Sequence, residues 1–257
     1  MDRQEYLVKR KVAAVVSYAG SAFSGWQKQA NAHSVQAEIE IALTRLTGEK
    51  IRVIGAGRTD AGVHAKGQVC SFYVPDFWET TKLSRALNAN IAPDVRIMRI
   101  IPVDDSFDAR RSALWREYVY FIWMGNVCVP HLRQMVWQNP RPWDFHAVEQ
   151  CCRLFEGKHD FSAFCKASEL PQNSIREIFR MTFRRKGSLA FFRIKGNAYL
   201  TNMVRIMIGS INLVAIGKKE PDWIKALLTG KPRTDGGPTA PAKGLFLWRI
   251  GYDTFTS

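Results

Sequence analysis

Hydrophobic and polar positions follow two periods along the chain. Apolar residues spaced three and four apart indicate helices, and short β-branched or aromatic runs bounded by turn residues indicate strands. The expected strands are 12–18, 51–54, 69–74, 95–103, 118–124, 178–183, 189–194 and 245–252, and the expected helices are 35–46, 82–89, 145–155, 200–216 and 223–228. One strand–helix–strand–strand unit opens this order, which predicts an α+β sandwich whose sheet has one covered face.

Local signals set several boundaries of these elements. Ser34 and Asp144 stand where a helix N-cap is expected, and Gly48 and Gly157 stand where a helix ends. Lys186-Gly187-Ser188 separates two β-rich runs, so we expect a hairpin there.

Length and composition indicate a globular protein. The 257 residues, 46% of them hydrophobic, suffice for one large or two small domains. We expect two lobes, 1–105 and 106–257, with a polar, basic tail over residues 1–11. The irregular segment 125–143, rich in Pro, Asn and Trp, is interpreted as a linker between the lobes.

Charge and cysteine content narrow the function classes. The net charge of +14 favours a polyanionic partner, most simply nucleic acid, and no run of eighteen apolar residues suggests a membrane span. Five scattered cysteines without a recognisable N-terminal signal peptide indicate reduced thiols in a cytoplasmic protein. Cys151 and Cys152 with His146 and His159 do not have the spacing of a standard zinc site.

The glycine-rich segment Gly55–Gln68 concentrates ionisable side chains between two expected strands. It can be a tight turn in which Asp60 caps backbone amides, or an anion cradle of glycine amides with Arg58 and Lys66. It can also place Asp60 and His64 on a metal, although no partner motif accompanies them. In a fourth interpretation Asp60 is a nucleophile or general base that a nearby arginine holds ionised.

Further segments carry aromatic or charged candidates. Arg110, Arg111 and Arg116 with Trp115 and Tyr118 combine positive charge with stacking faces, which suits single-stranded or distorted RNA.

Three further sets of residues leave two interpretations each. Phe23 and Trp26 belong either to the core or to an RNA-facing surface. His159 and Asp160 form either a structural turn or a catalytic pair. Arg205, near the start of an apolar helix, either faces solvent or needs a carboxylate partner.

A resemblance to a known family connects these segments. Gly57-Arg-Thr-Asp-Ala-Gly-Val-His-Ala65, followed by Gly67-Gln68-Val69, resembles the signature of TruA-type tRNA pseudouridine synthases. Similar motifs continue over most of residues 12–252; they are Tyr18-x-Gly-x-x-Phe-x-Gly-Trp-Gln27, Phe107-x-Ala-Arg110, Arg116-x-Tyr118, Gly157-x-His-Asp-Phe161, Met203-Val-Arg205 and Ala240-Pro-x-x-Gly-Leu-x-Leu247.

This resemblance implies a reaction and an architecture. Members isomerise uridine to pseudouridine at positions 38, 39 and 40 in the anticodon stem-loop of tRNA, without a metal or organic cofactor, and act as homodimers. It also implies two related α+β lobes, RRM/ferredoxin-like sandwiches with antiparallel sheets joined across a central basic cleft. The alternatives are an RNA-binding module without chemistry and a metal-dependent nuclease.

The same resemblance implies roles for individual residues. Asp60 would be the catalytic residue, Arg205 its ion-pair partner, and Tyr118 and Leu245 the two sides of the target base. Arg58 would fill the vacated space or hold a phosphate; Lys66 and Arg110 are further expected RNA contacts. There are two departures from the family pattern: Thr201-Asn202 stands where many members have His or Gln, and Asp108 stands where His is frequent. We expect neither to touch Asp60, Tyr118 or Arg205, so both should affect only details of RNA contact.

Overall fold

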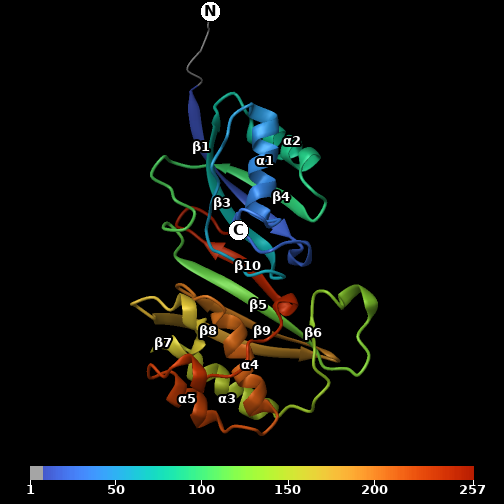
Figure 1. Ribbon diagram of the computed structural model, residues 1–257, viewed down its shortest axis with the longest axis vertical. Coiled ribbons are helices and arrows are strands. Elements are labelled where there is room, and N and C mark those ends of the chain that lie inside the picture. The colour runs from blue at the N-terminus through green and yellow to red at the C-terminus, as the bar shows by residue number, and fades with distance from the viewer. Residues whose placement is uncertain (1–7) are drawn as a thin grey trace, which may run out of the picture. The chain divides into compact units, whose positions relative to one another are not determined.

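The computed structural model of this mixed α/β protein describes residues 8–257. The described chain forms two compact units (Figure 1). The first contains the chain up to Leu114 together with Leu247–Ser257, and the second is Trp115–Phe246. Each unit has its own antiparallel strands and helices.

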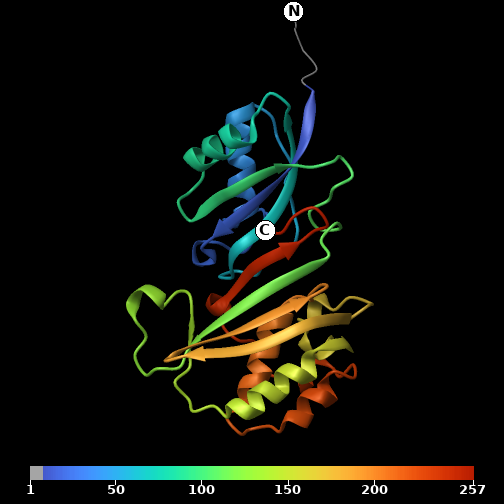
Figure 2. The same cartoon turned by 180° about the vertical axis from the view of Figure 1, so that it is seen from behind.

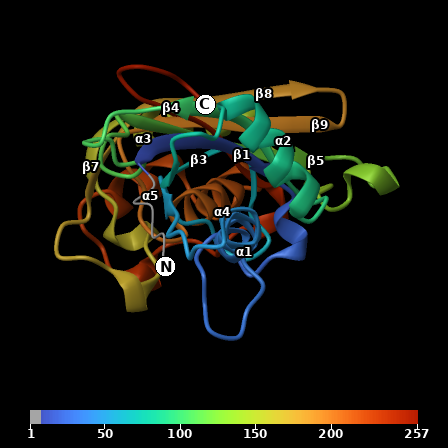
Figure 3. The same ribbon diagram turned by 90° about the horizontal axis from the view of Figure 1, so that it is seen from above.

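The first unit is built on a sheet in the order β4-β1-β3-β10, with the short β2 paired to β3. The strands are β1 (Lys9–Tyr18), β2 (Ile54–Gly55), β3 (His64–Pro75), β4 (Val95–Pro102) and β10 (Leu245–Gly251). β1 pairs antiparallel with both β3 and β4. Helices α1 (Val35–Thr47) and α2 (Thr80–Asn90) contact each other, and α2 lies against β4. Seen from above, α1 lies on one side of β1 (Figure 3).

The second unit has the strand order β5-β9-β8-β7, again antiparallel, and β6 pairs parallel with β5. Its strands are β5 (Trp115–Trp123), β6 (Trp137–Gln138), β7 (Gly157–Asp160), β8 (Ile175–Lys186) and β9 (Leu189–Gly196). Figure 2 shows the long β8–β9 hairpin in orange. Helices α3 (Phe145–Phe155), α4 (Met203–Ala215) and α5 (Pro221–Leu227) contact one another, and α3 lies against β8.

The helix signals in the sequence are confirmed. The Ser34 hydroxyl accepts a hydrogen bond from the Ala37 N–H, and Gly48 ends α1 in the left-handed conformation. The Asp144 carboxylate caps α3 by accepting from the backbone N–H groups of His146 and Ala147. These caps satisfy amides that have no partner within the helix. The predicted hairpin is also present, with Lys186 paired to Leu189.

Three expectations about the chain path are wrong. A strand is expected at 51–54, but the strand in the structure is only Ile54–Gly55, which pairs with β3. β3 already begins at His64, because an irregularity in the ladder lets Ala65 pair with Tyr18. The tail expected up to residue 11 is strand from Lys9 onward, paired with the end of β3. Residues 1–7 of the expected tail lie outside the described residues.

The segment 125–143 is not a linker between the two units, because it begins and ends within the second one. It contains a 3-10 turn at Pro130–Leu132 and strand β6. The division into lobes 1–105 and 106–257 stays a prediction about folding domains. In the structure, residues 106–114 and 247–257 lie with the first compact unit.

The burial of Phe23 and Trp26 decides between the two interpretations of these aromatic residues. Phe23 and Trp26 are 5% and 2% exposed, so both belong to the core and not to a surface that faces RNA. Among residues 8–257, no helix is long and apolar enough to cross a membrane.

Candidate active site

The loop that carries Asp60, residues 56–63, is held by backbone hydrogen bonds to the segment 20–26. The Trp26 N–H donates to the Thr59 carbonyl at 3.2 Å, and the Gly62 N–H donates to the Phe23 carbonyl at 3.4 Å. Within the loop, the Val63 N–H donates to the Asp60 carbonyl at 3.1 Å and closes a turn. Asp60 therefore stands in a backbone that is fixed on both sides.

Gly25 makes this close approach possible. Its φ is +96°, and a Cβ atom there would lie 2.4 Å from the Thr59 carbonyl oxygen. Any other residue would have both an unfavourable backbone conformation and a steric clash. This explains physically why a glycine precedes Trp26 in the motif.

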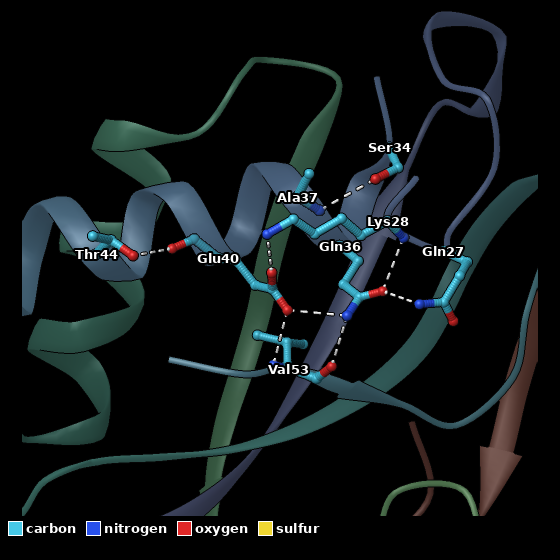
Figure 4. Close-up of polar contacts among 8 residues, drawn as sticks. All are labelled: Gln27, Lys28, Ser34, Gln36, Ala37, Glu40, Thr44 and Val53. Carbon is cyan, nitrogen blue, oxygen red and sulfur yellow. Dashed lines mark hydrogen bonds and ion pairs between the residues drawn. The ribbon is translucent and has the colours of Figure 1, made fainter. Parts of the chain in front are cut away.

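Helix α1 holds the segment that leads into the loop (Figure 4). The buried Gln36 side chain donates to the Val53 carbonyl at 3.1 Å and to the Glu40 carboxylate at 3.0 Å. Its amide oxygen accepts from Gln27 at 2.8 Å and from the Lys28 N–H at 3.0 Å. The Val53 N–H in turn donates to Glu40 at 3.2 Å. This network fixes the chain just before Gly55 to both α1 and residues 27 and 28.

Neighbouring side chains of the loop face different surroundings. The hydroxyls of Thr59 and Tyr18 lie 2.8 Å apart in the interior, whereas Arg58 is exposed and Asp60 is partly exposed. His64 is buried at 1% exposure, and its Nδ1 accepts from the Gly20 N–H at 3.1 Å. We therefore assign His64 a structural role. Within the described part of the chain, no three His, Cys, Asp or Glu side chains gather as a metal site.

Lys66 and Arg110, the other expected RNA contacts of the first unit, occupy separate positions. The Lys66 ammonium lies over the Trp248 ring, 4.3 Å from its centroid. Arg110 is exposed in a turn that the Asp108 carboxylate holds by accepting the N–H groups of Arg110 and Arg111, both at 2.8 Å. Asp108, one of the two departures from the family pattern, thus has a structural function as a turn residue.

In the second unit, Arg205 lies in the first turn of α4 and is partly buried. Its Nε donates to the Ala240 carbonyl at 2.8 Å, and its Nη1 donates to the Asn202 side-chain oxygen at 3.0 Å. The Ala240 N–H donates back to the Arg205 carbonyl at 3.0 Å. Arg205 therefore ties α4 to the loop 236–245. The alternative that it simply faces solvent is wrong.

The loop 236–245 contacts α4 closely along its first half. A Cβ atom at Gly209 would lie 1.8 Å from the Pro238 carbonyl oxygen, and the Gly237 N–H donates to the Ser210 hydroxyl at 3.1 Å. Further along, the Tyr120 hydroxyl donates to the Pro241 carbonyl at 2.8 Å. Burial raises the pKa of Tyr120, and the charge of Arg205 offsets only part of that rise, so the phenol stays a donor. Leu245, at the end of this loop, is 5% exposed.

Tyr118 lies in β5 and is 8% exposed. Its ring meets Tyr199 edge to face, with centroids 4.9 Å apart. Burial raises the pKa of Tyr199 well above its ordinary value, and its hydroxyl donates to the carbonyls of Ile194 and Arg116. The orientation of Tyr118 is thus supported by a second, buried tyrosine.

His159 and Asp160 do not bond to each other in the way that a catalytic pair requires. The Asp160 carboxylate accepts from the Ser162 N–H and from the hydroxyls of Ser162 and Ser174, and the His159 Nε2 lies 2.9 Å from the Glu156 carbonyl. Burial acts to raise the pKa of Asp160, but these hydrogen bonds outweigh it and hold that pKa below its ordinary value. All five cysteines are free thiols.

Some residues that shape the site carry no clear signal in the sequence. Tyr120 and Tyr199 have the appearance of ordinary strand or turn aromatics, and Asn202 stands out in the sequence only as a departure from the family pattern. Tyr120 could have been singled out by its spacing, since it lies two residues after Tyr118 and therefore on the same face of β5.

Comparison with known proteins identifies the family. The family model described as tRNA pseudouridine synthase matches residues 14–110 and 151–253. The chain is 37% identical to the tRNA pseudouridine synthase A of Geobacillus kaustophilus, with 95% of each chain covered. It is 39% identical to that of Methylacidiphilum infernorum, with 92% of this chain and 93% of the relative covered. The chain belongs to the tRNA pseudouridine synthase family.

As a member of the tRNA pseudouridine synthase family, the chain is an isomerase that converts uridine to pseudouridine in tRNA. The basic composition agrees with this polyanionic substrate. Among solved structures, the chain is similar to one in a Cbf5-Nop10-Gar1 complex, with a TM-score of 0.37, 14% identity and coverage of 78% of this chain and 44% of the other. A TM-score of this size does not establish a shared fold.

Proposed function

We propose that Asp60 is the catalytic nucleophile of this tRNA pseudouridine synthase and that the enzyme acts at positions 38, 39 and 40 in the anticodon stem-loop. The uninterrupted motif from Gly57 to Ala65 carries this proposal. It is supported by the partial exposure of Asp60 in a loop whose backbone is fixed on both sides. A reactive carboxylate is effective when its surroundings hold it in place before substrate arrives.

The chemistry requires one carboxylate and no external reactant. The N-glycosidic bond between N1 and C1′ breaks, the uracil turns over, and C5 bonds to C1′. The proton on C5 is lost and N1 gains one, so atoms and electrons balance. Asp60 forms a transient covalent bond, either to C1′ of the sugar or to C6 of the base, and is released at the end.

Arg205 is the proposed partner of Asp60. Two of its hydrogen bonds, to the oxygens of Ala240 and Asn202, hold the guanidinium in place without bringing a negative charge to it. An arginine cation beside a carboxylate favours the ionised form and binds it through charge-assisted hydrogen bonds. We propose that Arg205 binds the Asp60 carboxylate in this way and aims it at the substrate.

The target uridine must leave its stack, which costs a few kcal/mol. Tyr118 and Leu245 are proposed to hold the extruded base between an aromatic and an apolar side. Arg58, Lys66 and Arg110 are proposed to contact the RNA, with Arg58 filling the vacated space or holding its phosphate. Binding through such contacts should weaken as salt rises.

The finer architecture follows the same proposal. We infer two related α+β lobes of RRM/ferredoxin-like topology, with sheets joined across a central basic cleft, and a homodimer that acts on tRNA in the cytoplasm. The match of the family model in two segments of similar length supports the two related lobes.

Release of tritium from tRNA labelled with 5-³H-uridine tests the catalytic assignment. Wild-type enzyme should release tritium with or without chelator, and Asp60→Ala should release none. Asp76→Ala is a matched control, because Asp76 is an exposed aspartate of the same unit outside the proposed site. It should release tritium at the wild-type rate.

Two results would contradict the proposal. Turnover by Asp60→Ala would exclude Asp60 as the nucleophile. Absence of release by the wild type, despite salt-sensitive tRNA binding, would instead favour an RNA-binding module without chemistry. Mapping of the pseudouridines in the product tRNA tests positions 38, 39 and 40 separately from the nucleophile.

A further inference from the structure

Asn202, which immediately precedes α4, has an unusual backbone conformation. Its φ is +64°, and among residues 8–257 it is the only non-glycine residue with a positive φ. Asparagine accepts this left-handed region better than most residues, yet the conformation still carries a cost. The structure keeps it at the N-terminus of the helix that carries Arg205.

The side chain of Asn202 does not serve the purpose that its position suggests. It is the N-cap residue of α4, and asparagine is among the best N-cap residues because its oxygen can accept a free helix amide. Here the side chain makes no capping hydrogen bond. Its oxygen instead accepts from Nη1 of Arg205 at 3.0 Å. The local helix signal is therefore overridden by a contact to one side chain.

Two acceptors orient the Arg205 guanidinium from different nitrogens. Asn202 accepts from Nη1 and the Ala240 carbonyl accepts from Nε, so the pair limits rotation of the guanidinium plane. Both of these acceptors are neutral, so neither competes with a carboxylate for the charge of Arg205. An aspartate at position 202 would hold the same nitrogen but would compete for that charge.

We propose that Asn202 is a positioning residue for the isomerisation, acting by orienting the guanidinium of Arg205 through its side-chain oxygen. This inference rests on the proposed function, in which Arg205 assists Asp60. The backbone around it is held separately: the Asn202 carbonyl accepts the Ile206 N–H at 3.0 Å, and the Thr201 carbonyl accepts the Lys166 N–H at 3.0 Å. Loss of the side chain should therefore leave the start of α4 in place.

Asn202→Gly tests this role, because glycine adopts the same φ without strain and removes only the side chain. The single-turnover rate of tritium release at saturating enzyme should fall roughly ten- to a hundredfold, as expected for a misoriented catalytic group. The Kd for tRNA and the thermal unfolding temperature should stay close to wild type. A normal rate would overturn the proposal.

A double-mutant comparison separates positioning from a merely structural role. In an Arg205→Ala background, Asn202→Gly should cause no further loss of rate, because the residue through which it acts is gone. An equal loss in both backgrounds would overturn the proposal. If Arg205→Ala alone keeps the wild-type rate, both the proposed role of Arg205 and that of Asn202 fail. If Arg205→Ala is slow and Asn202→Gly is not, only the role of Asn202 fails.

Asn202→Asp is a second variant that tests the positioning role if Asn202→Gly does not fold. Aspartate also tolerates the left-handed region and is a good N-cap, so a purely structural role predicts a wild-type rate. The positioning role predicts a rate about tenfold lower with tRNA binding unchanged, since the added carboxylate draws on the charge of Arg205. Because aspartate keeps an acceptor oxygen for Nη1, the deciding comparison is with the Arg205→Ala background: a loss of equal size in both backgrounds would overturn the proposal.

Discussion

The loop 56–63 of the first unit and the loop 236–245 of the second are held in different ways. Backbone hydrogen bonds from the segment 20–26 hold the first, and its proposed reactive side chain, Asp60, takes no part in those bonds. Side chains of α4 and β5 hold the second; they are Arg205, Ser210 and Tyr120. One of these supports, Arg205, is itself a proposed site residue.

This difference determines how mutations should be interpreted. In the first loop, these backbone hydrogen bonds and the proposed chemistry belong to different groups, so a change of the Asp60 side chain leaves those backbone bonds in place. In the second, the guanidinium of Arg205 both supports the Ala240 backbone and supplies charge. A loss of activity in Arg205 variants therefore combines two effects, which stability measurements can separate.

The largest effects are expected for Asp60→Asn and Arg205→Met, which should differ in how they change the rate and the free energy of unfolding. Both should lower the single-turnover rate, Asp60→Asn by roughly a thousandfold or more because the nucleophile is lost. Asp60→Asn should change the free energy of unfolding by less than about 1 kcal/mol. Arg205→Met should lower it by roughly 2 to 4 kcal/mol, because the oxygens of Ala240 and Asn202 lose a charged donor. Tritium release and urea unfolding measure the two quantities.

Equal urea midpoints for Arg205→Met and wild type would break this comparison, since the guanidinium would then not hold the second loop. A strongly destabilised Asp60→Asn variant would also contradict the comparison of the two loops. The side chain of Asp60 would then contribute to the structure of its own loop.

A glycine substitution of intermediate effect tests the backbone support of the first loop. Gly25→Ala should destabilise the protein by roughly 3 kcal/mol and lower the rate, because of its positive φ and the clash with the Thr59 carbonyl. Gly48→Ala is the matched control: its φ is +75°, but nothing lies within 4 Å of the added Cβ. It should cost about 1 kcal/mol with no change in rate. Equal effects of the two in thermal unfolding would show that the contact with Thr59 is unimportant.

The smallest effects are expected from the loss of a single tyrosine hydrogen bond, that of Tyr120 in the second unit or that of Tyr252 in the first. Tyr120→Phe removes the bond to the Pro241 carbonyl and should cost about 1 kcal/mol. Because Tyr120 supports the same loop as Arg205, we also expect a small fall in rate. Tyr252→Phe removes a similar bond, to the Ala109 carbonyl at 2.7 Å in the first unit, and should cost a similar amount without that fall. If both variants keep the wild-type rate, the support of the loop 236–245 does not depend on this hydroxyl.

The sequence alone determined the features that depend on nearby residues. Ser34 and Asp144 cap amides two or three residues away, and Gly48 ends its helix through its own backbone conformation. The uninterrupted motif around Asp60 was sufficient to recognise the family, because it keeps its residue types in order along the chain. These signals extend over a few residues and can therefore be read before the chain is folded.

Only the tertiary structure decided the features whose partners are distant in sequence. β3 begins at His64 because Ala65 pairs with Tyr18, 47 positions earlier, and Gly25 is needed because the Thr59 carbonyl lies beside it. The expectation that Asn202 does not touch Arg205 is wrong, because the side-chain oxygen of Asn202 accepts from Nη1 of Arg205. That contact is local in sequence, but the usual preference of an N-cap asparagine predicts a hydrogen bond to a helix amide, which Asn202 does not make. The structure adds a second hydrogen bond, from Arg205 to Ala240, 35 residues further along, so partners that are near and distant in sequence hold the same guanidinium.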